Sequence, residues 1–379
     1  MKYCKNCLEP NTRPNSKFNE FGICLPCSAK EETTEIEWDR RVVEIEKICN
    51  WAKKNASRFY DCIIPVSGGK DSTRQALYMR DHLRMNPLLV TLAYPPEQQT
   101  ERGAKNMANL ISLGFNAYYI SLSPKTWKKL VKFNFIEFGN IFKSCELALF
   151  ASVPKLALKL NIPLIVYGEN PALQWGGDSH VSRDGNALKL KYSNTLSGGD
   201  LSHYIKAGFK KKLFWYDYPS DKELKKSKIK IIYLGYYVSN FDDDTNSKIA
   251  AQNGLELRTG EDADPHNTGS LVAYDALDDD FVFVNQMLKY LKFGFGKVTQ
   301  QLSGFIRKGI YTREEAVHIA KKYDGNCSSK YIKKFCNYIE ISEKKFWIIA
   351  EKFRNKKIWK KKNNKWYIPN FIIDDWYWE

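Results

Sequence analysis

The chain has 379 residues, which is enough for two domains or for one large domain with attachments. Hydrophobic residues make up 43% and aromatic residues 14% of the sequence, so a disordered chain is excluded. The net charge of +16 favours anionic partners such as nucleotides, nucleotide-linked sugars or nucleic acid, although lysine-rich usage on a solvated surface explains it equally well. No signal peptide or membrane-length apolar stretch is apparent, and we expect a cytoplasmic protein with reduced cysteines and no membrane partner.

The first segment, residues 1–32, is rich in cysteine and poor in apolar residues. Cys4 and Cys7 form one Cys-x-x-Cys pair, and Cys24 and Cys27 form another. Two such pairs supply four thiolates to one tetrahedral ion, and the metal provides folding energy that so short a segment lacks. We predict a structural Zn²⁺ site, while iron would fit the same cage. A redox dithiol is the alternative interpretation.

Residues 33–240 show short apolar segments alternating with amphipathic ones. A helix-period stretch covers 35–53, and further helices are expected at 72–83, 100–113 and 145–160. Expected strands are 62–66, 88–92, 118–120, 163–167 and 229–234. The alternation predicts an α/β fold with a parallel sheet covered on both faces. Pro65 inside the first strand is a mild objection, because proline lacks a ladder donor.

Residues 241–379 have a helical and basic pattern. Helices are expected at 281–293, 312–323, 330–338 and 342–354, and Thr312 with Glu315 reads as a capping box. The tail mixes lysines with Trp359 and Trp366. The acidic triplets 242–244 and 278–280 are interpreted as helix N-terminal charges in preference to metal sites.

A glycine-rich hexapeptide lies between the first expected strand and its helix. Glycines let the backbone approach a ligand, and amides at a helix N-terminus suit a phosphate. It is not the commoner P-loop, because Ile64 stands where the first glycine belongs and Asp71 follows the lysine. Asp71 is a candidate catalytic residue that would help hold Mg²⁺. The loop residues, which we expect to bind the phosphates of a ligand, are Ser67, Gly68, Gly69, Lys70, Asp71 and Ser72.

Other candidate contacts to the same ligand follow from the sheet. Ligands of parallel α/β folds bind beyond the carboxyl ends of the strands. Thr91 and Ala93 after the second strand, with Gly168 and Glu169 after the fourth, should therefore lie near the nucleotide. A plain loop is the alternative for the 168–171 turn.

The hexapeptide resembles the SGGxDS signature of the N-type ATP pyrophosphatases at every fixed position. The resemblance implies a Rossmann-like PP-loop domain over 33–240. It also implies cleavage of ATP between the α and β phosphates, so that AMP is placed on a carbonyl or amide oxygen and pyrophosphate leaves with Mg²⁺.

The whole chain resembles the N-acetyl sugar amidotransferase family. The resemblance implies a zinc-ribbon-like module, a PP-loop domain and a helical C-terminal region. It implies that ATP adenylates the acetamido oxygen of an N-acetylated sugar and that ammonia from a separate glutaminase displaces AMP, leaving an acetamidino group. The chain is especially similar to members acting in pseudaminic acid synthesis, which decorate flagellin. The segments that carry this resemblance are the four cysteines, 11–14, 67–72, 167–171, 233–237, 291–297, 313–316 and 322–325.

Lys292 and Lys297 flank a Gly-Phe-Gly turn and are candidate catalytic cations. They could neutralise pyrophosphate or a substrate carboxylate. Solvated lysines at a helix end are the equally weighted alternative.

The rival function is a tRNA-modifying enzyme of the thiouridine synthetase type, with the basic tail as its RNA footprint. It would need reactive cysteines at the ATP site, and Cys145 is the one candidate, which we expect to be buried instead. A pure binding module is a weaker third reading. Under the sugar interpretation we expect no nucleic-acid partner, and a homo-oligomer stays open.

Overall fold

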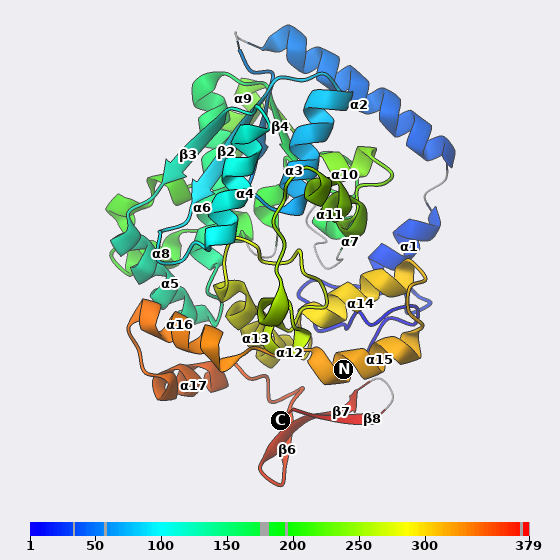
Figure 1. Cartoon of the computed structure of the whole chain (residues 1–379), viewed down its shortest axis with the longest axis vertical. Helices are drawn as coiled ribbons and strands as arrows, with labels where there is room; N and C mark the ends of the chain where they lie inside the picture. Colours follow the sequence, from blue (N-terminus) through cyan, green and yellow to red (C-terminus); the bar gives the residue numbers. More distant parts are fainter. Residues whose placement is uncertain (33–34, 57–58, 175–181, 194–195, 372–373, 379) are drawn as a thin grey trace.

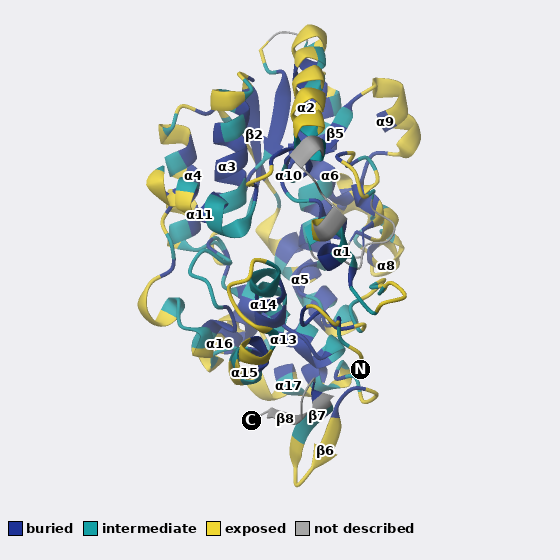
Figure 2. Ribbon diagram, turned by 90° about the vertical axis from the view of Figure 1, so that its right-hand side faces the viewer, coloured by how far each residue is buried: buried dark blue, intermediate teal, exposed yellow. Residues whose placement is uncertain are grey.

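The computed structural model describes residues 1–32, 35–56, 59–174, 182–193, 196–371 and 374–378. The chain begins with a loop-rich segment that ends in helix α1 (Leu25–Glu32), and the long helix α2 (Glu35–Asn55) then runs along one side of the molecule (Figure 1). Figure 2 shows that much of α2 is exposed on its outer side. No helix in these described ranges combines the length and the apolar character needed to cross a membrane.

Five parallel strands form the central sheet, as the alternating sequence pattern predicted. The strands are arranged in the order β3-β2-β1-β4-β5 and are paired in parallel throughout. β1, β2 and β4 are almost wholly buried, which explains their continuous apolar sequences. Their bounds are β1 Cys62–Pro65, β2 Pro87–Ala93, β3 Ala117–Ser121, β4 Leu164–Tyr167 and β5 Lys230–Tyr233.

Helices connect these strands and cover both faces of the sheet. Figure 2 shows α3 and α4 on one side of the sheet and α6 on the other. The helix after β1 is shorter than the sequence pattern suggested, because its last turn, Tyr78–His82, is a π-helix. The principal helices are α3 Lys70–Leu77, α4 Glu101–Ser112, α5 Pro124–Phe138, α6 Lys143–Leu160 and α9 Asp221–Ser227.

The strand order places a switch point at β1. The chain moves from β1 to β2 and β3 on one side and then returns to β4 on the other, so a crevice forms beyond the carboxyl ends of β1 and β4. β1 pairs with β4 at Cys62 and Ile63, whereas its pairing with β2 continues to Pro65. Proline is tolerated at Pro65 because β1 has already parted from β4 there. The same separation opens the crevice.

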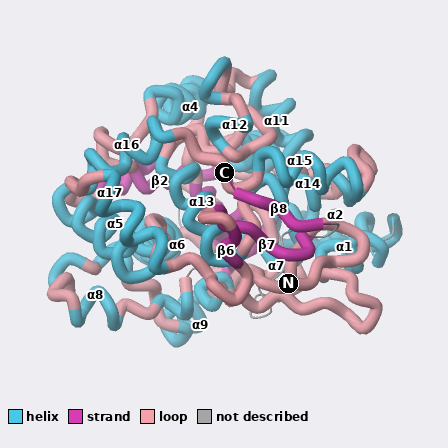
Figure 3. The backbone as a smooth tube through the Cα atoms, turned by 90° about the horizontal axis from the view of Figure 1, so that it is seen from below, coloured by secondary structure: helices cyan, strands magenta, loops and turns pink. Residues whose placement is uncertain are grey.

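The C-terminal region is helical, as expected, but it ends in a small sheet. Thr312 forms the predicted capping box with Glu315 at the start of α15. The basic tail folds into an antiparallel sheet, β6-β7-β8, beside α13 (Figure 3). The elements are α10 Leu234–Tyr237, α11 Asp243–Gln252, α12 Pro265–Thr268, α13 Phe281–Phe293, α14 Lys297–Arg307, α15 Arg313–Tyr323, α16 Ser329–Ile339, α17 Glu343–Lys352, β6 Lys360–Lys362, β7 Lys365–Phe371 and β8 Asp374–Trp378.

The cysteine-rich segment packs against this C-terminal region. Leu8 is fully buried in an apolar cluster with Tyr290, Leu302 and Trp359. Arg313 on α15 donates hydrogen bonds to the carbonyls of Cys4 and Cys7, each at 3.3 Å. Residues from the two ends of the sequence therefore share one core.

Candidate functional site

The predicted ATP loop is a tight turn between β1 and α3. Gly68 has φ +78°, and a Cβ there would lie 3.1 Å from the amide nitrogen of Met107 on α4. Glycine satisfies both the left-handed backbone and the close approach. Gly69 is the extended N-cap of α3, and its carbonyl accepts hydrogen bonds from the hydroxyls of Ser72 at 3.1 Å and Thr73 at 3.0 Å. The backbone path fits the predicted phosphate-binding role.

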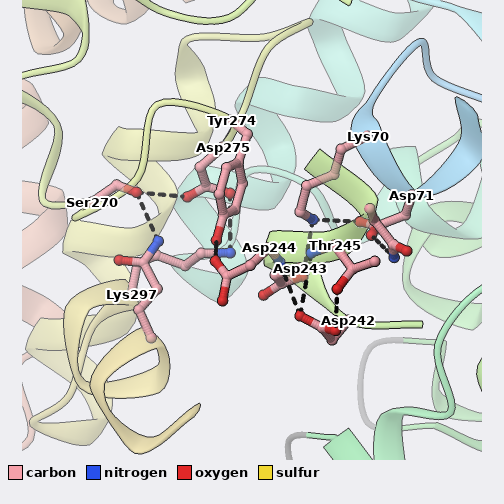
Figure 4. Close-up of polar contacts among 12 residues, drawn as sticks. Lys70, Asp71, Asp242, Asp243, Asp244, Thr245, Ser270, Tyr274, Asp275 and Lys297 are labelled. Carbon is pink, nitrogen blue, oxygen red and sulfur yellow. Dashed lines mark hydrogen bonds and ion pairs between the residues drawn. The ribbon is translucent and has the colours of Figure 1, made fainter. Parts of the chain in front are cut away.

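Lys70 lies in a network of carboxylates. Its Nζ contacts Asp71 Oδ2 at 2.5 Å and Asp243 Oδ1 at 3.0 Å (Figure 4). Asn246 Nδ2 donates to Asp71 Oδ1 at 2.9 Å. Burial alone lowers the pKa of Lys70, but the charges of Asp71, Asp243 and Glu169 outweigh burial and hold that pKa well above its usual value. Lys70 therefore stays protonated and links α3 to α11.

A large cavity of about 490 Å³ opens on one side of this loop, at the crevice between β1 and β4. Among the residues that line it are Ser67, Gly69, Asp71 and Ser72 together with Gly168 and Glu169. The structure thus brings the loop and the segment after β4 together. We call this the large cavity; its remaining walls include Arg13, Pro65, Gln75, Leu149, Phe150, Tyr167, Pro171, Leu190, Ser193 and Tyr233.

Glu169 is a carboxyl group of the large cavity whose pKa is raised. Burial, and then the nearby charge of Asp71, raise the pKa of Glu169 to about 7 against the opposing effect of Lys70. Its backbone is fixed from both sides: Gly235 N donates to Gly168 O at 2.9 Å, and Asn170 Oδ1 accepts from Ala172 N at 2.9 Å. Asp71, on the loop, offers an oxygen ligand of the kind that Mg²⁺ prefers, so this residue fits that ion.

A small pocket of about 60 Å³ lies on the other side of the loop, beyond β2. Ser67, Thr91 and Ala93 line it, so the structure brings the predicted contacts after β2 to the loop as well. Asp278 also lines this pocket, and burial raises its pKa to about 6. Asp278 approaches so closely that a Cβ on Gly103 would lie 2.6 Å from its Cα.

The two candidate catalytic lysines occupy different places. Lys297 pairs with Asp275 at 3.0 Å, and the charges of Asp243 and Lys70 reach it, so it lies toward the loop (Figure 4). Burial lowers the pKa of Lys297, but Asp275 and Asp243 outweigh it and raise the pKa overall. Lys292 instead donates to the carbonyl of Phe138 at 2.8 Å, and burial lowers its pKa. The structure separates the two cations, and their catalytic roles stay predictions.

The four cysteines converge as predicted. Cys4, Cys7, Cys24 and Cys27 are buried, and their Sγ atoms all lie within 4.8 Å of one another. Cys7 Sγ and Cys24 Sγ are 3.6 Å apart, close to the roughly 3.8 Å expected between thiolates on one tetrahedral ion with Zn–S bonds of about 2.3 Å. The amide of Cys24 also donates to Cys4 Sγ at 3.2 Å. The site fits a single tetrahedral zinc or iron ion. Four cysteine ligands would fill its coordination positions, so none would remain for a substrate or a catalytic water.

Cys145 behaves as a buried residue, as expected. It lines the small pocket but is 4% exposed, and burial raises its pKa well above the ordinary value. Burial therefore disfavours the thiolate that nucleophilic chemistry requires.

Several site residues escaped the sequence reasoning or had another role assigned. Asp242 caps α11, as the triplet interpretation predicted, but its neighbour Asp243 reaches Lys70. Arg13 and Asn246 come from distant segments, and only their folded positions reveal them. The loop and the Arg-containing 11–14 segment both stood out in the sequence, but nothing in either pattern indicates that they meet.

The C-terminal segment is similar to a known protein family. Residues 275–371 match the family described as "LPS biosynthesis protein WbpG-like, C-terminal domain", which is less than half of the chain. No curated protein matches the sequence.

Several solved structures are similar at low identity, among 27 chains that match. NMN synthetase from Francisella tularensis has 14% identity and a TM-score of 0.28, covering 36% of this chain and 57% of that chain. U34-tRNA thiolase NcsA from Methanococcus maripaludis, with its [4Fe-4S] cluster, has 13% identity and a TM-score of 0.31, covering 84% and 88%. NH3-dependent NAD synthetase from Campylobacter jejuni subsp. jejuni NCTC 11168, in complex with nitrate, has 14% identity and a TM-score of 0.28, covering 59% and 99%.

The loop and the sheet define the class of fold: an α/β domain with a five-stranded parallel sheet and a glycine-rich loop after its first strand, with a Cys4 module before the sheet and a mainly helical region after it. Within that last region, residues 275–371 are similar to the WbpG-like C-terminal domain.

Proposed function

We propose that this chain is an ATP-dependent amidotransferase acting on an N-acetylated bacterial sugar, of the pseudaminic acid type. It would convert the acetamido group into an acetamidino group and release AMP and pyrophosphate. One observation carries the proposal: the complete Ser67–Ser72 loop faces a cavity of about 490 Å³ that also contains Glu169. The cavity leaves room for an acceptor beside the phosphates. The WbpG-like match, whose family description is LPS biosynthesis, supports a sugar acceptor.

The first step is adenylation of the acceptor. The amides of Gly68 to Lys70 would hold the phosphates, and the acetamido oxygen would attack the α-phosphorus as pyrophosphate leaves. When bound, Mg²⁺ would spread the charge of the departing pyrophosphate, and Asp71 is the residue to hold it. The amide nitrogen loses its proton to solvent, and the product is an O-adenylyl imidate in which AMP is a good leaving group.

The second step replaces oxygen by nitrogen. Ammonia attacks the imidate carbon, AMP leaves, and the amidine forms. We assign its supply to a separate glutaminase subunit. Glu169 lies in the same cavity with a pKa of about 7, so near neutral pH it can accept the proton that the attacking nitrogen releases. The rival tRNA-thiolating activity would need a reactive thiol here, and the burial of Cys145 disfavours it.

The test is a product assay. The protein is incubated with ATP, Mg²⁺, ammonium and a panel of N-acetylated sugars and sugar acids. Acceptor-dependent AMP and pyrophosphate, with a product in which NH replaces O by mass, are expected. Asp71→Asn should abolish turnover, whereas Asp81→Asn, an exposed aspartate of the following π-turn, should retain it. Formation of ADP, or no nucleotide consumption with any acceptor, would refute the proposal.

A further inference from the structure

The Gly294-Phe295-Gly296 turn between α13 and α14 is built to hold one aromatic ring in place. Gly294 ends α13 at φ +73°, and a Cβ on Gly296 would lie 2.5 Å from Asp324 Oδ1. Asp324 is fully buried and accepts hydrogen bonds from Gly296 N at 2.8 Å and Thr299 Oγ1 at 2.6 Å. The turn leaves Phe295 only 2% exposed. The hydrogen bonds that hold the turn therefore also fix the position of the Phe295 ring.

The side chains of Arg13 and Lys289 lie against this ring. The guanidinium carbon of Arg13 is 4.7 Å from the ring centroid of Phe295, and Lys289 Nζ is 4.9 Å from the same centroid. Lys289 also donates to Gln300. Burial, and then the positive charges of Arg13 and Lys297, lower the pKa of Lys289 well below its ordinary value. The charge beside the ring is therefore that of Arg13, because burial and the charge of Arg13 disfavour protonation of Lys289.

Arg13 belongs to the Cys4 module, yet it lines the large cavity. Its side chain is 12% exposed, and its Nε and Nη2 atoms donate to the two carboxylate oxygens of Glu9, which is 4% exposed. Thr12 anchors the same segment by donating to Phe293 O at 2.5 Å. Within the described residues, Arg13 Nη1 donates to no protein acceptor. Glu9 fixes one edge of the guanidinium, and the ring of Phe295 fixes one face. The remaining N–H donors are therefore left for a ligand.

We propose that Arg13 binds an anionic group of the acceptor, a carboxylate on the sugar, so that the Cys4 module forms one wall of the substrate site. This inference rests on the proposed function, since it assigns the acceptor's place in that same cavity. Fixing the guanidinium before binding removes the entropy cost of ordering a long side chain, and burial strengthens its attraction for an anion.

The charged groups of the large cavity suggest different places for ATP and for the acceptor. Lys70 on the loop side is balanced by Asp71, Asp243 and Glu169. Those groups suit a metal-bound phosphate chain. Arg13 comes from the Cys4 module, at the start of the sequence, and packs against the ring of Phe295. An acceptor held by its carboxylate at Arg13 could direct its acetamido group toward the loop.

The experiment measures binding of two probes that differ in one charge. N-acetylneuraminic acid and its methyl ester are titrated by calorimetry into the full-length protein with α,β-methylene-ATP present. The wild type should bind the acid about 10- to 100-fold more tightly than the ester, which is the range expected for a charge-assisted bidentate contact. Arg13→Gln should bind both equally.

Two further variants control for folding and for charge. Arg13→Gln leaves Glu9 buried without its partner, so the Glu9→Gln/Arg13→Gln double variant is measured beside it and should behave in the same way. Lys5→Gln removes an exposed positive charge from the same module and should keep the wild-type preference. Zinc content and thermal melting report whether each variant retains the module.

The outcomes separate this inference from the proposed function. A wild type that binds neither probe, or that binds both equally, overturns the role of Arg13. So does a double variant that keeps the preference for the acid, or one whose main defect is tenfold weaker binding of ATP, because Arg13 would then hold phosphate. Acid-selective binding without AMP formation from any acceptor would refute the amidotransferase and leave the anion site standing.

Discussion

Replacing Glu169 by glutamine should make the protein more stable at alkaline pH. Glu169 lies in the large cavity, where burial and the charge of Asp71 raise its pKa from 4.5 to about 7. The folded state therefore holds this proton more tightly than the unfolded state does. Glutamine keeps the size of the side chain and removes the ionisation.

The sign and size follow from that pKa difference. Between pH 4.5 and about 7 the folded state binds more protons at Glu169 than the unfolded state, so its contribution to stability falls as the pH rises through this window. Raising the pKa from 4.5 to about 7 corresponds to a contribution of about 3 kcal/mol to the free energy of unfolding. This contribution is fully present below pH 4.5 and is lost above pH 7. Lys70 and Mg²⁺ both favour the ionised form of Glu169. Adding Mg²⁺ should therefore reduce the difference in stability between Glu169→Gln and the wild type at alkaline pH.

Urea unfolding at pH 5 and at pH 8 measures the effect. We expect Glu169→Gln to match the wild type at pH 5 and to exceed its free energy of unfolding by 1–3 kcal/mol at pH 8, roughly the pKa-derived value reduced by solvent relaxation. Glu20→Gln, at an exposed position, should show no such pH dependence. Equal stability of Glu169→Gln and the wild type at pH 8 would show that the carboxylate is not desolvated in the way this geometry requires.

Three further predictions concern the loop, the lysines and the cysteines. Gly68→Ala places a Cβ at φ +78° against α4, and it should cost about 1–2 kcal/mol of stability and raise the KM for ATP at least about tenfold, by urea titration and kinetics; an unchanged KM would contradict it. Lys297→Ala should lower kcat more than Lys292→Ala, because Lys297 faces the loop and Lys292 faces Phe138 O; the reverse order would show that this placement misleads. Chelation of the Cys4 metal should lower Tm and expose residues 1–32 to proteases, and an unchanged digestion pattern would count against a structural ion.

The sequence predicted the sheet and the loop well because both depend on local signals. Apolar runs of strand length mark β1, β2 and β4, and the hexapeptide carries its own backbone requirement at Gly68. Pro65 looked like a flaw when read by strand pattern alone. In the structure it ends the pairing of β1 with β4 and opens the crevice, which strand propensity cannot reveal because it depends on the neighbour of each strand.

The walls of the cavities could not be predicted in the same way. Arg13 meets the loop region only because the Cys4 module packs on α13 to α15, and Asp243 meets Lys70 only because α11 packs on α3. Such contacts join segments distant in sequence, and neither residue type nor spacing encodes them locally. The basic tail shows the converse limit: its lysines and tryptophans suggested a helical region, whereas pairing between β6, β7 and β8 gives a sheet.

The Cys4 module is connected to the site in two ways: it contains Arg13, which lines the large cavity, and it contacts Arg307. Arg307 lies 3.9 Å from Cys7 Sγ and donates to Gln174 O at 3.2 Å, at the end of the short helix α7 (Pro171–Gln174) that follows Glu169. Arg13 extends from the same module into the large cavity. An ion that fixes the four thiolates therefore also fixes Arg13, which lines the large cavity, and supports Arg307, which contacts the helix that follows Glu169. A metal with no open coordination position can in this way affect substrate binding without taking part in the chemistry.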